Sequence, residues 1–164
     1  MRTLTQFDIN PSEPRWVAVN DGVMGGRSSG GPTLKDGALQ FAGMLSLENG
    51  GGFSSIRTVD YLVDLSEVSA VLLRVRGDGR VYQVRLATDA QHLGLAVSYG
   101  AEFVTVAGKW IEVRVGFDAL RPSVRGTVLE GPPFDPSKVR QIGVLVGDKK
   151  EGPFSLEIDW IAVE

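Results

Sequence analysis

The sequence contains no cysteine. That absence excludes a disulfide scaffold, a thiolate metal site and a cysteine nucleophile. It has a single histidine, His92, in a polar stretch, and one imidazole with no second nitrogen or sulfur ligand gives little support for a transition-metal site. Apolar runs fall short of the roughly 20 residues of a membrane-spanning helix. The one Asn-x-Ser triplet has Pro11 in its middle, which disqualifies it as a glycosylation acceptor.

Basic residues are also in short supply. Lysine and arginine total 17 against 20 acidic residues, a formal net charge of −3, so composition gives no indication of nucleic-acid binding. The segment Met1 to Asp8 has neither the apolar core of a secretion signal nor the arginine-rich, acid-poor composition of a transit peptide. From these features we expect a cytoplasmic protein without a membrane span.

Helical periodicity is scarce, and short alternating strand patterns separated by Gly, Pro and Asp take its place. The sequence therefore predicts an all-β, antiparallel two-sheet sandwich, and 164 residues fit a single domain over 1–164. Two short helical turns are expected, at 64–68 and 135–139. The expected strands are 15–19, 38–47, 53–58, 69–76, 81–88, 93–98, 102–106, 110–115, 140–146 and 154–163.

One pair of strands predicts a detailed register. The stretches 71–76 and 81–86 flank Gly77-Asp78-Gly79-Arg80, a loop of hairpin length. If Arg76 pairs with Val81, all the apolar residues of both strands face one side, whereas a one-residue slip would mix the two faces. The residues then expected together on the polar side are Arg74, Arg76, Gln83 and Arg85. Arg57 joins them if it faces the same way as Phe53 and Ser55.

The three tryptophans are expected to differ in exposure. Trp160 alternates with apolar residues of the last strand and is assigned to the core, and Trp16 also has apolar neighbours. Trp110 shares a side with Glu112 and Arg114, so it is predicted to be the exposed one.

Two glycine-rich corners, 22–31 and 50–52, bracket a strand. Within the first, Gly26 to Gly30 matches the Gly-x-Ser-x-Gly pattern of hydrolases, but that pattern needs a following helix and a histidine base. Gly31-Pro32 prevents such a helix, so we expect a turn and no enzyme. The corner carboxylates Asp21 and Glu48 could form a glycosidase pair. Carboxylates in corners more commonly accept backbone N–H groups.

These corners also carry a resemblance to a known family. Together with later segments, they resemble the complex I intermediate-associated protein 30 family. The matching residues are Trp16, Asn20 to Gly26, Ser28, Phe41 to Gly43, Leu47 to Asn49, Gly51 to Phe53, Arg57, Tyr99, Phe103, Trp110, Pro122 to Gly126, Gly147 to Lys149, Gly152 to Phe154 and Leu156 to Ile161. The resemblance implies a galactose-binding-like jelly roll, similar to some carbohydrate-binding modules. It implies a binding or assembly role, as in mitochondrial members that assist assembly of respiratory complex I, and it brings no catalytic residue.

A structural calcium ion is the one cofactor left open. The resembling modules often hold one, and Asp8, Glu157 and Asp159 lie near the two ends of the chain. These oxygen ligands suit calcium, but no Asp-x-Asp spacing is present.

The function predicted from the sequence is a non-enzymatic binding or assembly domain that contacts a protein or a small anionic or polar ligand through a polar sheet face. The candidate contact residues are Arg57, Arg74, Gln83, Arg85, Glu48, Asn49 and Trp110. Two alternatives remain open. The arginines could pair internally with Glu48, Glu112 or Asp148, or the domain could be a lectin-like carbohydrate-binding module with an exposed aromatic platform. The partner and the oligomeric state stay undetermined.

Overall fold

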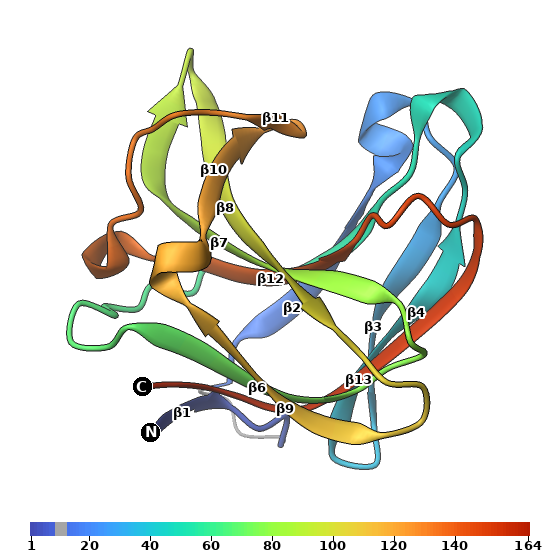
Figure 1. Cartoon of the computed structure of the whole chain (residues 1–164), viewed down its shortest axis with the longest axis horizontal. Helices are drawn as coiled ribbons and strands as arrows, with labels where there is room; N and C mark the ends of the chain where they lie inside the picture. The colour runs from blue at the N-terminus through green and yellow to red at the C-terminus, as the bar shows by residue number, and fades with distance from the viewer. Residues whose placement is uncertain (9–12) are drawn as a thin grey trace.

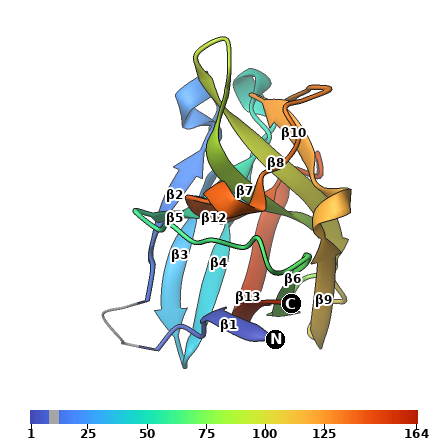
Figure 2. The ribbon, with the colours of Figure 1, turned by 90° about the vertical axis from the view of Figure 1, so that its left-hand side faces the viewer.

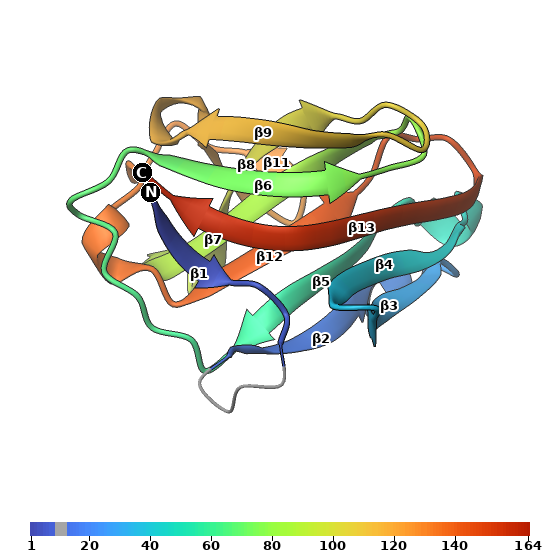
Figure 3. The ribbon, with the colours of Figure 1, turned by 90° about the horizontal axis from the view of Figure 1, so that it is seen from below.

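Two antiparallel β-sheets packed face to face make up the computed structural model, which describes residues 1–8 and 13–164 (Figures 1 and 3). This confirms the all-β, two-sheet sandwich. Its helices are single 3₁₀ turns: η1 (Asp21–Met24), η2 (Glu48–Gly50), η3 (Phe117–Ala119) and η4 (Pro136–Lys138). In the described part of the chain, no helix has the length and apolar character needed to span a bilayer.

The first sheet has six strands, with the long β13 near its middle. β1 pairs with β13, which brings the two ends of the chain together (Figure 3). The order is β3 (Ser29–Lys35), β4 (Ala38–Leu45), β13 (Gly152–Val163), β6 (Ala70–Arg76) and β9 (Trp110–Gly116), with β1 (Arg2–Thr5) off this path.

The second sheet has seven strands and bends about β12, so that its outer face lies on the inside of the bend (Figure 1). β7 and β8 continue beyond the other strands as a long hairpin (Figure 2). The order is β11 (Thr127–Val128), β10 (Arg121–Val124), β8 (Leu95–Val104), β7 (Val81–His92), β12 (Gln141–Val146), β5 (Ser54–Val59) and β2 (Arg15–Asn20).

Strand β13 shows how the alternating pattern forms the core. Phe154, Leu156 and Ile158 are buried between the sheets, as their period of two predicts. The register with β6 then shifts between Ile158 and Trp160, and this bulge reverses the phase of the strand. As a result Ile161 enters the core, whereas Trp160 is only half-buried, so its assignment to the core was wrong.

The predicted hairpin between 71–76 and 81–86 does not form. β6 pairs with β13 and β9 in the six-stranded sheet, and β7 pairs with β8 and β12 in the seven-stranded sheet. The loop 77–80 therefore crosses between the sheets. Asp78 anchors this crossing, because its carboxylate accepts hydrogen bonds from the Tyr82 hydroxyl at 3.0 Å and from the Ser155 N–H at 2.9 Å. Alternation shows which face of a strand is buried, but not which sheet the strand joins.

Other differences concern strands rich in turn residues. A single strand, β8, replaces the two expected at 93–98 and 102–106. β3 was not predicted because it contains Gly30, Gly31 and Pro32; it lies at the edge of its sheet, where proline is tolerated. β1, β10 and β11 are short and were also missed. Of the two helical turns, η4 forms with Asp135 as its cap, whereas 64–68 contains a turn but no helix.

Candidate functional site

Three arginines share one row across the outer face of the seven-stranded sheet. Reading along the paired residues from β5 to β10, the row is Arg57, Gly143, Arg85, Gly100 and Arg121. Residues directly opposite one another point to the same face, so all three arginine side chains belong to this face. Because neighbouring strands lie about 4.8 Å apart, each arginine Cα stands about 10 Å from the next.

The side chain of Arg85 lies over Gly100. A Cβ atom placed on Gly100 would stand 2.8 Å from Arg85 Nε and 2.9 Å from its Cδ, so only glycine leaves room for it. Arg85 Nη1 donates to the hydroxyls of Ser98 at 3.3 Å and Ser123 at 3.1 Å. Nε is buried without a hydrogen-bond partner in the described structure. Burial lowers the pKa of the Arg85 guanidinium from its ordinary value.

None of the three arginines, Arg57, Arg85 and Arg121, is ion-paired with a carboxylate in the described part of the chain. Arg121 Nη1 donates to the backbone carbonyl oxygens of Asp118 and Leu120, which carry no net charge. Guanidinium groups without a carboxylate are suited to bidentate contact with an oxyanion.

Gln83, another expected contact residue, lies in the neighbouring row of the same face. It pairs with Glu102 on β8 and with Leu145 on β12. The structure therefore brings Arg57, Gln83 and Arg85 together. It adds Arg121, which sequence reasoning missed because its strand was not predicted.

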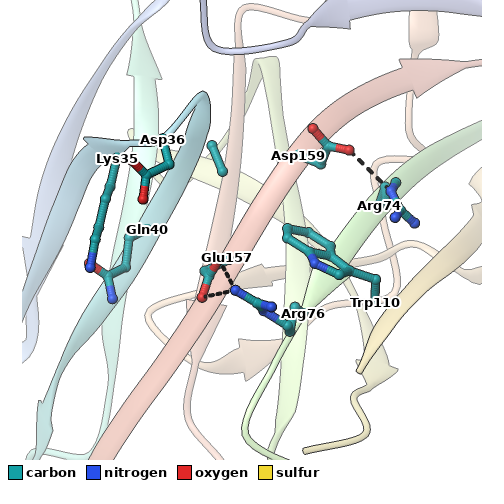
Figure 4. Close-up of a pocket in the computed structure, with 9 residues that line it drawn as sticks. Lys35, Asp36, Gln40, Arg74, Arg76, Trp110, Glu157 and Asp159 are labelled. Carbon is teal, nitrogen blue, oxygen red and sulfur yellow. Dashed lines mark hydrogen bonds and ion pairs between the residues drawn. The ribbon is translucent and has the colours of Figure 1, made fainter. Parts of the chain in front are cut away.

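Arg74 and Trp110 lie on the other side of the molecule, on the outer face of the six-stranded sheet. A hollow of about 350 Å³ there is lined by Arg74, Arg76, Trp110, Glu157 and Asp159, among others (Figure 4). Because β6 and β7 belong to different sheets, the expectation that Arg74 shares a face with Arg85 is wrong.

The groups in this hollow contact one another. The Trp110 ring lies between two guanidinium groups, with the Cζ atoms of Arg74 and Arg76 at 5.1 and 5.0 Å from its centre (Figure 4). Arg74 Nε lies 3.1 Å from Asp159, and Arg76 Nη2 lies 2.8 Å from Glu157. Arg74 is thus paired internally, with Asp159 rather than with the acids expected. The partly exposed ring of Trp110 is covered by cations.

Asp21 ties the two glycine-rich corners together. Its side chain is buried and accepts hydrogen bonds from the N–H and hydroxyl of Ser28, at 2.8 and 2.6 Å, and from the N–H of Gly52, at 2.7 Å. Burial raises the pKa of the Asp21 carboxyl, but the hydrogen bonds from Ser28, Gly52 and Phe53 outweigh it, so the pKa lies below its ordinary value. This carboxylate therefore has a structural role.

Glu48 and Asn49 lie in the η2 corner and not in the arginine row. Glu48 is paired at 3.6 Å with Arg27, and both side chains are about two-thirds exposed. Asn49 has a positive φ of 56° and forms the turn itself. Two of the suggested calcium ligands, Glu157 and Asp159, are engaged by Arg76 and Arg74. The described residues contain no group of three or more His, Cys, Asp or Glu side chains arranged to hold a metal ion.

Comparison with known proteins gives a match over nearly the whole chain. A family model described as complex I intermediate-associated protein 30 matches residues 5–158. A Mus musculus protein named complex I intermediate-associated protein 30, mitochondrial, is 29% identical over 187 residues, covering 99% of this chain and 56% of that protein. A Caenorhabditis elegans protein named probable complex I intermediate-associated protein 30, mitochondrial, is 30% identical over 138 residues. The match covers 79% of this chain and 39% of that protein. The chain thus spans about half or less of these relatives.

Solved structures share the fold at low sequence identity. A family 11 carbohydrate-binding module from Clostridium thermocellum, in complex with a mixed-linked tetrasaccharide, superposes with a TM-score of 0.69 at 14% identity, covering 99% of this chain and 94% of the module. CBM28, a carbohydrate-binding module specific for non-crystalline cellulose, superposes with a TM-score of 0.56 at 12% identity, covering 98% of this chain and 92% of the module. At such identities the likeness shows the fold alone, and it confirms the expected similarity in fold to carbohydrate-binding β-sandwiches.

The expectation of a cytoplasmic protein is wrong. The relatives named above are mitochondrial proteins, which points away from the cytoplasm. That expectation rested on the composition of eight residues, and so short a stretch does not determine a compartment.

Proposed function

This chain belongs to the complex I intermediate-associated protein 30 family, and on that premise we propose that it is a non-enzymatic binding domain of the assembly-factor type. Its partner is a protein, and the names of the relatives make intermediates of complex I the first place to look for it. The contact surface is the outer face of the seven-stranded sheet.

One observation carries this proposal: that face holds the three arginines without a carboxylate partner. Some arginines elsewhere are paired, as Arg74 is with Asp159 and Arg80 with Asp148 at 2.8 Å. Like charges in a sheet repel one another unless an opposite charge lies between them. A partner that supplies acidic groups to this face would provide that charge.

The proposed absence of catalysis is supported by the state of Ser28. Its hydroxyl donates to the buried Asp21 and also accepts from the N–H of Ser46 at 2.9 Å. A nucleophilic serine needs an imidazole or comparable base beside it. The single histidine, His92, is exposed and pairs with Leu95 in the β7–β8 hairpin, a different part of the fold.

A carbohydrate-binding module remains the alternative, because it shares the fold. Sugar recognition on such a face relies on aromatic side chains that stack against the rings. The aromatic residues of the seven strands instead pack on the core side: Trp16, Tyr82, Tyr99 and Phe103. Phe53, which directly precedes β5, is the aromatic residue that could serve the alternative.

The test uses purified complex I assembly intermediates and three immobilised forms of the chain. These are the wild type, a variant with Arg57, Arg85 and Arg121 all replaced by Gln, and the control Arg114→Gln on the opposite sheet. We expect the wild type and control to retain intermediates and the triple variant to lose them. Failure of the wild type to retain any intermediate, together with glycan-array binding that depends on Phe53, would favour the carbohydrate alternative.

A further inference from the structure

The arginine row has a regular construction that a scattered set of surface charges would lack. Arginine occupies β5, β7 and β10, and glycine occupies the two strands between them. The result is a row of three arginines whose Cα atoms span about 20 Å, with a repeat of about 10 Å set by two strand spacings.

The two glycines leave room for the neighbouring strand and for the arginine side chains. A Cβ on Gly143 would stand 2.7 Å from the carbonyl oxygen of Ile56 and 3.2 Å from the Cβ of Arg57. A Cβ on Gly100 would meet the flat side chain of Arg85. Gly143 is itself buried and Arg85 covers Gly100, so the two glycines let the arginine side chains lie close against the sheet.

The row is cationic although the protein is acidic, with a net charge of −3. Arg85 is the central member and is half-buried, and its guanidinium donates hydrogen bonds to two neutral serine hydroxyls. A desolvated cation without a counter-ion is unfavourable for the free protein. It becomes favourable once an anion binds beside it.

Given the binding role proposed above, we propose that this row binds an acidic segment of the partner protein, with one carboxylate against each of Arg57, Arg85 and Arg121. The spacing of about 10 Å between arginine Cα atoms is close to one three-residue turn of a polyproline II chain, which returns every third side chain to the same face. It also corresponds to two turns of an α-helix. A nucleic acid fits less well, because it needs a broad basic patch, whereas Glu102 lies on this face beside the row.

The direct test is fluorescence anisotropy with labelled peptides of defined spacing. One peptide is proline-rich, to favour polyproline II, and has glutamate at every third position. A second is helical with glutamate at every seventh. A third replaces each glutamate of the first with lysine, and a single-stranded oligonucleotide serves as a further probe. We expect at least one glutamate peptide to bind, with affinity that falls as salt rises. Tighter binding of the oligonucleotide, or equal binding of the lysine peptide, would overturn the inference.

Substitutions in the arginine row test whether the glutamate peptide binds there. Arg85→Gln should weaken peptide binding about tenfold or more, because it removes charged hydrogen bonds. Arg114→Gln removes the same charge on the opposite sheet and should bind like the wild type. Gly100→Ala keeps every charge but displaces the Arg85 side chain, so it should weaken binding several-fold. Unchanged affinity in Arg85→Gln and Gly100→Ala, with their folds verified by circular dichroism, would show that the row is not the site.

The two proposals can fail separately. If the chain retains complex I intermediates, and the triple variant retains them equally well, the binding role stands and the acidic-segment inference is wrong. If the wild type binds the glutamate peptide but no intermediate, the inference holds for the surface and the proposed assembly role is wrong.

Discussion

Arg85 lies flat over Gly100, with its Nε buried and without a hydrogen-bond partner in the described part of the chain. The pairing is tight enough that a Cβ on Gly100 would stand 2.8 Å from that nitrogen. The arrangement places a partly desolvated positive charge on the sheet surface, and its side-chain hydrogen bonds in the described structure go to the neutral hydroxyls of Ser98 and Ser123. A charge that lowers the stability of the free protein in this way is typical of a site retained for binding and not for stability.

We therefore predict that Arg85→Met leaves the protein as stable as the wild type or more so. Methionine keeps an apolar stem over Gly100 and removes the uncompensated charge. Replacing such a charge with an apolar group is often neutral or stabilising by about 1 kcal/mol or more. In a domain of this size that would raise the melting temperature by about 2–4 °C. Differential scanning calorimetry checks this, and a fall of several degrees would show that Arg85 is structural.

Asp21→Ala should strongly destabilise the fold. It removes the acceptor for the N–H groups of Ser28 and Gly52 at the two corners. Leaving such groups unsatisfied in a buried corner costs about 1–3 kcal/mol each, so we expect a total loss of about 3 kcal/mol or more. Urea unfolding measures the loss. Asp89→Ala, at an exposed position, is the control and should stay within about 0.5 kcal/mol of the wild type.

The same carboxylate predicts a pH dependence. The pKa of Asp21 is lowered in the folded protein, so as pH falls the unfolded chain takes up the proton first. The stabilisation is complete above the unfolded value of about 3.9 and is lost as pH falls towards the folded pKa. The free energy of unfolding should therefore fall more steeply below about pH 4 in the wild type than in Asp21→Asn. Equal slopes in urea titrations between pH 3 and 7 would contradict this.

The network around Trp110 should contribute to stability and not to partner binding. A double-mutant cycle between Arg74 and Asp159 should give a coupling of about 0.2–1 kcal/mol, as for other partly exposed ion pairs. Trp110→Ala should destabilise more than Arg74→Ala, because it removes the contacts with both guanidinium groups. Retention of complex I intermediates should be unchanged in all these variants. A loss of retention in well-folded Trp110→Ala would move the contact surface to the six-stranded sheet.

Much of the fold follows from local patterns in the sequence. The burial of Phe154, Leu156 and Ile158 was predicted from alternation alone, because side chains in a strand alternate between the two faces. The bulge after Ile158 was not, because a change of phase arises from pairing with β6, a strand far away in sequence. The predicted pairing of 71–76 with 81–86 failed for a similar reason. A hairpin loop and a crossover between sheets can have the same length, so the loop 77–80 did not show that β6 and β7 join different sheets.

The candidate site was predicted only in part. Arg57, Gln83 and Arg85 do share a face, but they share it through β12, which lies between β5 and β7. The importance of Gly100 and Gly143 could not be seen from the sequence, because it depends on which residues stand opposite them. Arg121 could have been suggested only by recognising β10 as a strand.

The position of β13 bears on how the chain folds as it leaves the ribosome. β13 lies between β4 and β6 and pairs with both, so neither strand has its inner neighbour until residues 152–163 have been synthesised. Until then two sheet edges remain open, and open edges favour pairing with other chains. The nascent protein therefore has a period of exposure that ends only when its last strand inserts. In a crowded cell, completion of the six-stranded sheet is the step at which a chaperone would be of most use.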